Sequence, residues 1–298
     1  MKSWLVVLAV SCATQSCAAQ SGNLSDWKKL IEKCDSKAAE KLCTGFVNSK
    51  IVAEQVEAQK CLANVSLCGN DIVQLEGDDA GGGTIRGGYS PESVDAALVH
   101  LNLALKLAPQ DITIHEGRLH LLEVAGRYGD MVKALDESCT IYEGKNGVDV
   151  WLNYAPELFE LRQFETGVEF MTVLDKHYPN NSDVLGNIGA FLDMMKRDSE
   201  AIPYLKRAVA LAPNDPINTW DLGRAYDYAG QIKDADSWYN KALPLMTDPE
   251  QKKGSLCIYA EFVEKKLNDR SRACELEKQN CEADKQTACA ATTSPPNQ

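Results

Sequence analysis

Two histidines and a glutamate stand close together near the middle of the chain, at His115, Glu116 and His120. Residues of these types can hold a zinc ion and activate a water molecule for hydrolysis, with the imidazoles as ligands and the carboxylate as general base. That chemistry requires both imidazoles on one face of a helix, which an i, i+4 spacing provides. The step here is five residues. On a regular helix such a step turns the second ring about 140° away from the first.

The inserted residue does not remove zinc chemistry from consideration, because the segment resembles that of metallopeptidases of the dipeptidyl-peptidase III type, which tolerate such an insertion. Both histidines nevertheless fall on a helix of the repeat described below, where packing is the simpler interpretation. We therefore expect no catalytic residue, no metal and no cofactor. A zinc-dependent hydrolase built on His115, Glu116 and His120 is kept as the alternative function.

A glycine-rich segment covers residues 77–89. Backbone amides of such a segment can cradle a phosphate, but that requires a preceding strand and a following Lys-Ser or Lys-Thr pair. Neither feature stands beside this segment. We predict a flexible linker here.

Eleven cysteines are unusual for a protein kept in a reducing compartment. Cys12 and Cys17 lie near the N-terminus, and Cys139 stands alone in the middle of the chain. The other eight form one cluster before the repeats and one after them, which indicates disulfides whose pairing the spacing leaves open. These candidates are Cys34, Cys43, Cys61, Cys68, Cys257, Cys274, Cys281 and Cys289.

The N-terminus has the pattern of an export signal. Lys2 precedes an apolar run over residues 4–13, and small residues continue to Ala19. This run is too short to cross a bilayer, so we predict a signal peptide over residues 1–19 and a secreted or periplasmic protein. Residues 9–12 also resemble a lipidation motif, so a lipid-anchored assembly factor is a further alternative. No later segment is long and apolar enough to predict a membrane span.

The chain is acidic, with a formal net charge of -12 and a sequence pI near 4.9. Such a surface repels phosphate backbones and disfavours nucleic acid as a partner. It favours a neutral or basic partner, although acidity also serves solubility.

A period of 34 residues runs from residue 148 to residue 249. Small and large apolar residues recur at set offsets within it, which is the signature of one helical hairpin stacked several times. Small residues allow two backbones to approach closely, and large residues fill the space to the next hairpin. Pairs at this spacing are Gly189 and Gly223, Ala201 and Ala235, Leu205 and Tyr239, and Ala208 and Ala242.

This pattern resembles the tetratricopeptide repeat family. The unit at 182–215 matches the family pattern at eight positions, and the units at 148–181 and 216–249 match it at most of them. Pro156 departs from the pattern, because a proline inside a helix removes a backbone hydrogen bond and should kink or restart the helix. The eight matching residues of the unit at 182–215 are Leu185, Ile188, Gly189, Leu192, Ala201, Leu205, Ala208 and Pro213.

The resemblance implies an all-α fold, a right-handed α-solenoid of helix pairs. Around it we expect a small cysteine-rich helical N-terminal region and a C-terminal capping helix that covers the open end of the stack. The predicted boundaries are residues 1–19 for the signal peptide, 20–76 for the cysteine-rich region, 77–89 for the linker, 90–250 for the solenoid, 251–268 for the capping helix and 269–298 for a polar, partly disordered tail.

The family likeness also implies a groove lined by the first helix of each pair, which binds a peptide or a protein. We therefore predict an extracytoplasmic interaction scaffold and not an enzyme. For Trp220 the alternative is packing inside the stack. Carried over by position, the groove candidates are Glu116, His120, Glu123, Leu152, Phe159, Asp183, Asp193, Ile217, Trp220, Arg224, Asp227 and Tyr228.

Overall fold

The computed structural model describes residues 24–33, 35–68, 71–77, 83–142, 147–279 and 289. The predicted signal peptide, Cys34 and Cys281 lie outside the described residues. The chain divides into two compact units, residues 1–150 and 151–298, and each is described by itself. The division therefore falls inside the segment that the sequence assigns to one continuous solenoid. Among the described residues, no helix is long and apolar enough to cross a membrane.

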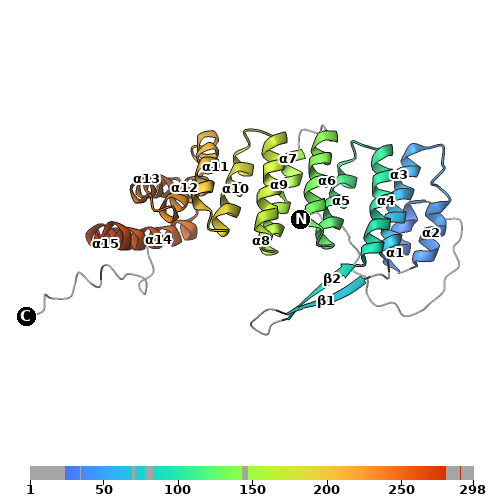
Figure 1. The fold of residues 1–298 in the computed structure, drawn as a ribbon, viewed down its shortest axis with the longest axis horizontal. Helices are drawn as coiled ribbons and strands as arrows, with labels where there is room; N and C mark the ends of the chain where they lie inside the picture. Colours follow the sequence, from blue (N-terminus) through green and yellow to red (C-terminus); the bar gives the residue numbers. More distant parts are fainter. Residues whose placement is uncertain are drawn as a thin grey trace, which may run out of the picture. The chain divides into compact units, whose positions relative to one another are not determined.

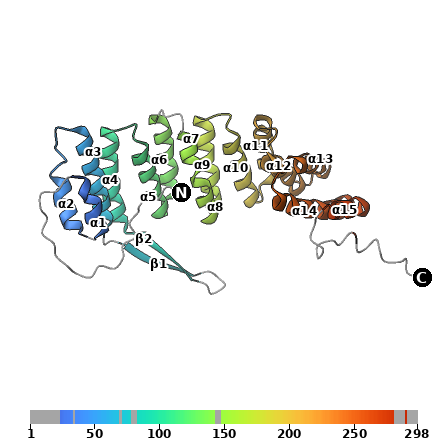
Figure 2. The ribbon, with the colours of Figure 1, turned by 180° about the vertical axis from the view of Figure 1, so that it is seen from behind.

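The first unit is built from helices that pack in sequence order (Figures 1 and 2). Helix α3 packs along α4, and Ala63, Ala97 and Ala104 belong to the apolar core between and around them. Ser90 begins α4 by accepting a hydrogen bond from the backbone of Ser93, with Pro91 in the first turn, as its sequence predicts. The elements are η1 (Leu24–Asp26), α1 (Trp27–Glu32), α2 (Ser36–Thr44), α3 (Val52–Leu67), α4 (Pro91–Leu107), α5 (Ile112–Val124) and α6 (Tyr128–Ile141).

A disulfide between Cys43 and Cys61 joins α2 to α3, with the two Cα atoms 6.2 Å apart. Both cysteines are fully buried in a small apolar cluster with Trp27 and Ile31. Helices as short as α1 and α2 bury little surface, so a covalent link to the longer α3 stabilises them. The sequence left this pairing open.

A β-hairpin is the exception to the all-α prediction. Strands β1 (Asp71–Gly77) and β2 (Gly83–Tyr89) are antiparallel, with a register that runs from Asp71 opposite Tyr89 to Gly77 opposite Gly83. The glycines of this segment suggested a flexible linker, but the β-branched residues at 72–73 and 84–85 favour strands. The hairpin stands between α3 and α4, which pack together, so it connects two helices of one unit rather than two domains.

The second unit confirms the predicted helical hairpins that repeat every 34 residues. The second helix of each pair begins at Phe164, Asp198 and Ile232, which are 34 residues apart (198 − 164 and 232 − 198). Helix α10 packs on α9 and α11, and α12 packs on α11 and α13, as Figures 1 and 2 show. The pairs are α8 (Tyr154–Glu160) with α9 (Phe164–His177), α10 (Ser182–Met194) with α11 (Asp198–Leu211), and α12 (Pro216–Tyr228) with α13 (Ile232–Ala242).

The glycines of the repeat stand where the helices come closest. A Cβ atom added to Gly189 would lie 2.5 Å from the side chain of Leu205, in the facing helix of the same hairpin. A Cβ atom at Gly223 would lie 2.9 Å from the ring of Tyr239. Carbon atoms do not approach this closely, so these positions require glycine and confirm the physical reason given for the 34-residue pattern.

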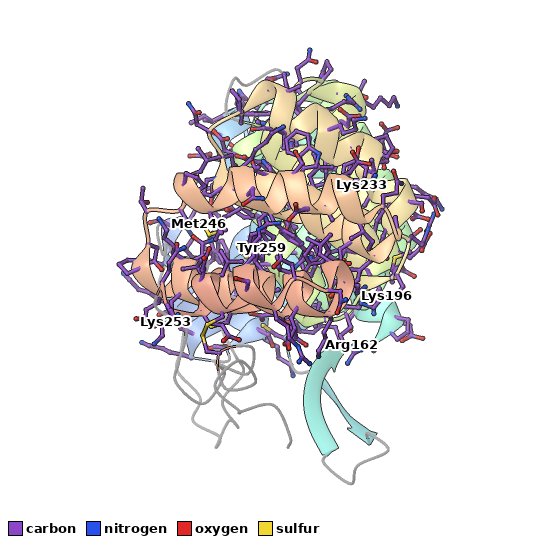
Figure 3. The ribbon with its side chains drawn as sticks, turned by 90° about the vertical axis from the view of Figure 1, so that its left-hand side faces the viewer. Arg162, Lys196, Lys233, Met246, Lys253 and Tyr259 are labelled. Atoms are coloured by element: carbon purple, nitrogen blue, oxygen red, sulfur yellow. A yellow bond between two sulfur atoms is a disulfide. The ribbon has the colours of Figure 1, made fainter. Side chains whose placement is uncertain are left out.

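Each turn inside a hairpin contains one residue in the left-handed conformation. Arg162, Lys196 and Gly230 have φ angles of 55°, 60° and 76°, again at 34-residue spacing. Residues other than glycine are uncommon in this backbone conformation, which costs them about 1 kcal/mol. In Figure 3 Arg162 and Lys196 lie at the same edge of the second unit. The repeat therefore places a basic side chain at a strained turn in two successive hairpins.

Pro156 breaks the first helix of its repeat as predicted. Helix α7 (Gly147–Leu152) ends four residues before it, and α8 begins at Tyr154. A proline at 156 cannot donate to the carbonyl of Leu152, and its ring crowds that carbonyl. The helix therefore restarts with Pro156 in the first turn of α8, where no such bond is needed.

The second unit ends in η2 (Leu243–Leu245), α14 (Pro249–Leu267) and α15 (Arg270–Glu277). The predicted capping helix thus begins two residues earlier than expected, and part of the predicted polar tail is helical. Tyr259 of α14 donates to Asp236 of α13 over 2.6 Å, and Arg272 of α15 donates to the same carboxylate, so three helices meet at Asp236. A disulfide joins Cys274 to Cys289.

Candidate binding face on helix α12

The first histidine of the alternative zinc motif, His115, is part of the core of the first unit. His115 is fully buried. Its Nε2 lies 2.8 Å from the carbonyl oxygen of Pro109, and its Nδ1 lies 2.9 Å from the hydroxyl of Ser138. Burial lowers the pKa of His115, which favours the neutral ring with Nε2 donating to the carbonyl of Pro109. Nδ1 contacts the Ser138 hydroxyl, which also donates to the carbonyl of Ala134 over 2.7 Å. Both ring nitrogens are therefore occupied by structural hydrogen bonds.

The other members of the motif do not complete a metal site. His120 has its Nδ1 3.2 Å from Glu123, and the ring is partly exposed. Burial raises the pKa of Glu116, and the charge of Asp111 raises it further. Over the residues that the structure describes, no three His, Cys, Asp or Glu side chains are arranged to hold a metal ion. These contacts favour packing over zinc chemistry for this helix.

The remaining groove candidates lie in the second unit and differ in exposure. Trp220 is 8% exposed and its ring packs on Tyr239 at 4.5 Å between centroids, which matches the packing alternative. Phe159 is half-buried and stacks on Phe191 at 4.0 Å. Leu152 is also half-buried, and Asp183 is exposed at the start of α10. These four residues lie beneath or beside the candidate binding surface. The exposed side chains of α12 form the surface itself.

Four residues form a stripe along one face of α12. Ile217, Asp221, Arg224 and Tyr228 follow an i, i+4, i+7, i+11 spacing, which places them above one another on a helix. Ile217 is 57% exposed and Tyr228 is 54% exposed, whereas Asp221 and Arg224 are partly buried between them. We call these residues the α12 stripe. It presents two apolar side chains to solvent with a charged pair in the middle.

The charged part of the stripe continues into the neighbouring hairpin. Arg224 Nη2 lies 3.1 Å from Asp221 and 3.3 Å from Asp193 of α10. Asp193 in turn faces Asp198 at the start of α11, and both residues are more than nine-tenths buried. We call Asp193, Asp198, Asp221 and Arg224 the Asp193 cluster. It holds three carboxyl groups against one guanidinium.

The Asp193 cluster is incompletely paired, because two of its carboxyl oxygens and Nε of Arg224 have no hydrogen-bond partner. Two carboxyl groups that face each other can form a hydrogen bond only if one is protonated. With both ionised, Oδ1 of Asp193 and Oδ1 of Asp198 have no hydrogen-bond partner. Burial, with the contact to Asp193, raises the pKa of Asp198 to about 6. Burial likewise raises the pKa of Asp221 to about 6, with Arg224 opposing the effect and Asp193 and Asp215 adding to it.

A shallow hollow of about 310 Å³ opens beside this cluster. Its lining includes Lys196 and Asp198 from the turn and start of α11, and Tyr228 from the end of the α12 stripe. The ammonium group of Lys196 lies 5.0 Å from the centre of the Tyr228 ring. Sequence reasoning found Asp193, Arg224 and Tyr228, but it missed Asp198, Asp221 and Lys196. Asp198 begins a second helix and Lys196 lies in a turn, outside the first helices from which the groove positions were taken.

The unusual pKa of Asp198 leads to a test by stability. A folded-state pKa raised from 3.8 to about 6 means that the folded protein holds this proton longer than the unfolded chain as the pH rises. The stability contributed by this group is therefore present below pH 3.8 and is lost as the pH rises through about 6. The groups that face Asp198 are Asp193, Lys196 and, through Asp193, Asp221 and Arg224.

We expect Asp198→Asn, which cannot ionise, to raise the free energy of unfolding by about 1–2 kcal/mol at pH 7.5 and to change it little at pH 4. Urea denaturation of wild type and variant at both pH values measures this. Glu165→Gln, which removes the same charge from an exposed ion pair, is the control and should change stability by less than about 0.5 kcal/mol at either pH. An Asp198→Asn variant that is less stable than wild type at pH 7.5 would contradict the account.

Comparison with known proteins identifies similar folds. No family model matches the chain, and no curated protein matches it. Among solved structures, YrrB, described as a TPR protein with an unusual peptide-binding site, is 16% identical with a TM-score of 0.46, over 65% of this chain and 98% of YrrB. MamA of Desulfovibrio magneticus RS-1 is 20% identical with a TM-score of 0.44, over 61% of this chain and 97% of the MamA chain.

PilF of Pseudomonas aeruginosa is 17% identical with a TM-score of 0.43, over 67% of this chain and 90% of PilF. At these values the neighbours carry nothing specific to the α12 stripe or the Asp193 cluster. The function of the α12 stripe and the Asp193 cluster is therefore inferred from their own residues.

Proposed function

We propose that this protein is a non-enzymatic scaffold outside the cytoplasm, which binds an extended segment of another protein along the α12 stripe. The observation that carries the proposal is the pairing of two exposed large apolar side chains, Ile217 and Tyr228, with a buried excess of carboxyl groups between them. Exposed large apolar and aromatic side chains are typical anchors of a recognition surface, and charged groups beside them add specificity.

The spacing of the stripe supports an extended partner rather than a small molecule. Ile217 and Tyr228 are eleven residues apart on one helix, which corresponds to about 16 Å. An extended chain covers that distance with about five residues. A segment of that length can contact both apolar ends and pass over the charged middle.

The carboxyl excess supports a partner segment with basic character. Arg224 balances one of the three carboxyl groups in the Asp193 cluster, and a cationic segment would balance the others. The net charge of -12 acts in the same direction over the whole surface.

Export is proposed from the sequence and from the disulfides. Residues 1–19 have the pattern of a signal peptide, and disulfides such as Cys43–Cys61 and Cys274–Cys289 persist in oxidising compartments. The mass of the mature N-terminus tests this directly. Removal of residues 1–18 or 1–19 supports a plain signal, whereas an acylated N-terminal cysteine supports the lipid-anchored alternative.

A photo-crosslinker placed in the stripe tests the binding face. We expect benzoylphenylalanine at position 228 or at position 217 to form a discrete adduct with one protein in an extracytoplasmic extract, and mass spectrometry to map the attachment to one short segment. The control position is Leu211, which is also exposed but belongs to the second helix of a hairpin. Equal crosslinking from position 211, or no adduct from either stripe position, would contradict the proposal.

The substitution that best weakens binding without unfolding is Ile217→Ser with Tyr228→Ala. Both side chains are more than half exposed, so their loss removes little core packing. Trp220 is unsuitable for this purpose, because its buried ring packs on Tyr239 and its removal would open a cavity.

A further inference from the structure

Asp198 is a buried acid that lines an open hollow. It is 7% exposed, and its Oδ1 has no hydrogen-bond partner. It nevertheless forms part of the wall of the 310 Å³ hollow, together with Lys196, Ser199 and Tyr228. A buried carboxylate with one oxygen left unpaired is costly to keep, so its presence beside a hollow of side-chain size needs a physical reason.

A cation bound in the hollow would supply that reason. The Asp193 cluster sets three carboxyl groups against the single guanidinium of Arg224. In the described part of the chain, no set of three or more His, Cys, Asp or Glu side chains has the arrangement that a metal ion requires. An organic cation that approaches from the hollow fits better, because it needs hydrogen-bond acceptors and an aromatic wall rather than a closed shell of oxygens.

A side chain of the protein itself already places a positive charge in the hollow. The ammonium group of Lys196 lies 5.0 Å from the centre of the Tyr228 ring, within the range of a cation–π contact. Lys196 stands in the left-handed conformation, with φ of 60°, so its backbone position is strained. Arg197, the other cation of the lining, is held by Glu200 at 2.8 Å and Glu165 at 3.2 Å. Tyr228 and Asp198 therefore form a corner that accepts a cation, and Lys196 places its ammonium group there.

We propose that the hollow between Asp198 and Tyr228 binds the guanidinium group of an arginine side chain carried by the partner segment. The guanidinium stacks on the ring of Tyr228, displaces the ammonium of Lys196 and donates hydrogen bonds to the carboxylate of Asp198. Arginine fits better than lysine because its planar group can stack on an aromatic ring and donate to a carboxylate at the same time. This proposal rests on the proposed function and gives the partner segment its central anchor.

Short peptides test the proposal without the native partner. The probe is acetyl-Ala-Ala-Arg-Ala-Ala-amide, and the matched control is the same peptide with citrulline, which has the shape of arginine without its charge. We expect the arginine peptide to bind the full-length mature protein at pH 7.5 in the millimolar range and to shift the amide resonances of residues 196–199 and 228–229. The citrulline peptide should bind at least about tenfold more weakly.

Two variants give opposite effects. Asp198→Asn should weaken binding of the arginine peptide at least about tenfold, and Glu165→Gln, which removes one charge from the exposed ion pair with Arg197, should leave it within about twofold. Lys196→Gly should strengthen binding severalfold, because it removes the competing ammonium and relaxes the turn. Binding should also weaken at pH 5, where a proton on Asp198, which faces Asp193 and Lys196 and lies near Asp221 and Arg224, competes with the guanidinium.

Equal binding of both peptides would overturn the proposal, as would weaker binding to Lys196→Gly or resonance shifts confined to other residues. Circular dichroism of each variant separates loss of binding from loss of folding. Failure here is distinguishable from failure of the proposed function. If the arginine peptide does not bind but position 228 still crosslinks to one segment, the binding face stands and the arginine anchor falls.

Discussion

Gly189→Leu is expected to unfold the second unit, with a loss of at least about 4 kcal/mol in the free energy of unfolding. Even a single added carbon at this position would lie 2.5 Å from the buried side chain of Leu205. Leu205 is 1% exposed, so it has no open space into which it can move. The larger side chain must therefore separate α10 from α11, and urea denaturation followed by circular dichroism measures the result.

A second glycine supplies the control. Gly254 lies within α14, and nothing stands within 4 Å of an added Cβ atom there. Gly254→Leu should leave the fold unchanged or stabilise it by about 0.5–1 kcal/mol, because leucine favours the helix more than glycine does. If both substitutions had the same effect, close approach of the helices would not be the reason for the repeated glycines.

His115→Ala is expected to destabilise the first unit by about 2–4 kcal/mol. The substitution leaves a cavity in the core and removes the partner of the Ser138 hydroxyl and of the Pro109 carbonyl. His120→Ala is the matched control, because its ring is partly exposed, and it should cost less than about 1 kcal/mol. Urea denaturation of the three proteins gives these values.

The same variants decide the zinc alternative. The account predicts that purified wild-type protein carries no stoichiometric zinc and that added zinc does not raise its unfolding temperature. One equivalent of zinc that is lost on either His115→Ala or His120→Ala would instead support the hydrolase.

The repeat fold could be predicted from the sequence because each close helix contact needs a residue of a particular size. Gly189 and Gly223 are small because Leu205 and Tyr239 face them. A different rule, that proline inside a helix cannot donate a backbone hydrogen bond, predicted the break at Pro156. By contrast, the β-hairpin was missed because glycine signals flexibility in one context and tight pairing in another, and only the partner strand decides between them.

The candidate site was predicted in part. Position along the first helices led to Asp193, Arg224 and Tyr228, but the sequence could not show that Trp220 turns inward onto Tyr239. Nor could it show that Asp198, the first residue of the next helix, faces Asp193 across the hairpin. The contact between two acidic residues on either side of a tight turn depends on how the turn folds back, so no periodic pattern in the sequence predicts it.

The most direct test of the central claim is hydrogen exchange on the full-length mature protein, measured with and without the free partner segment that the crosslinking experiment identifies. The account predicts that the segment slows exchange in residues 190–199 and 217–229, and that Ile217→Ser with Tyr228→Ala abolishes this protection while the free protein exchanges as wild type does. Protection confined to α11 and α13, or to residues 24–142, would place the binding surface elsewhere and contradict the account.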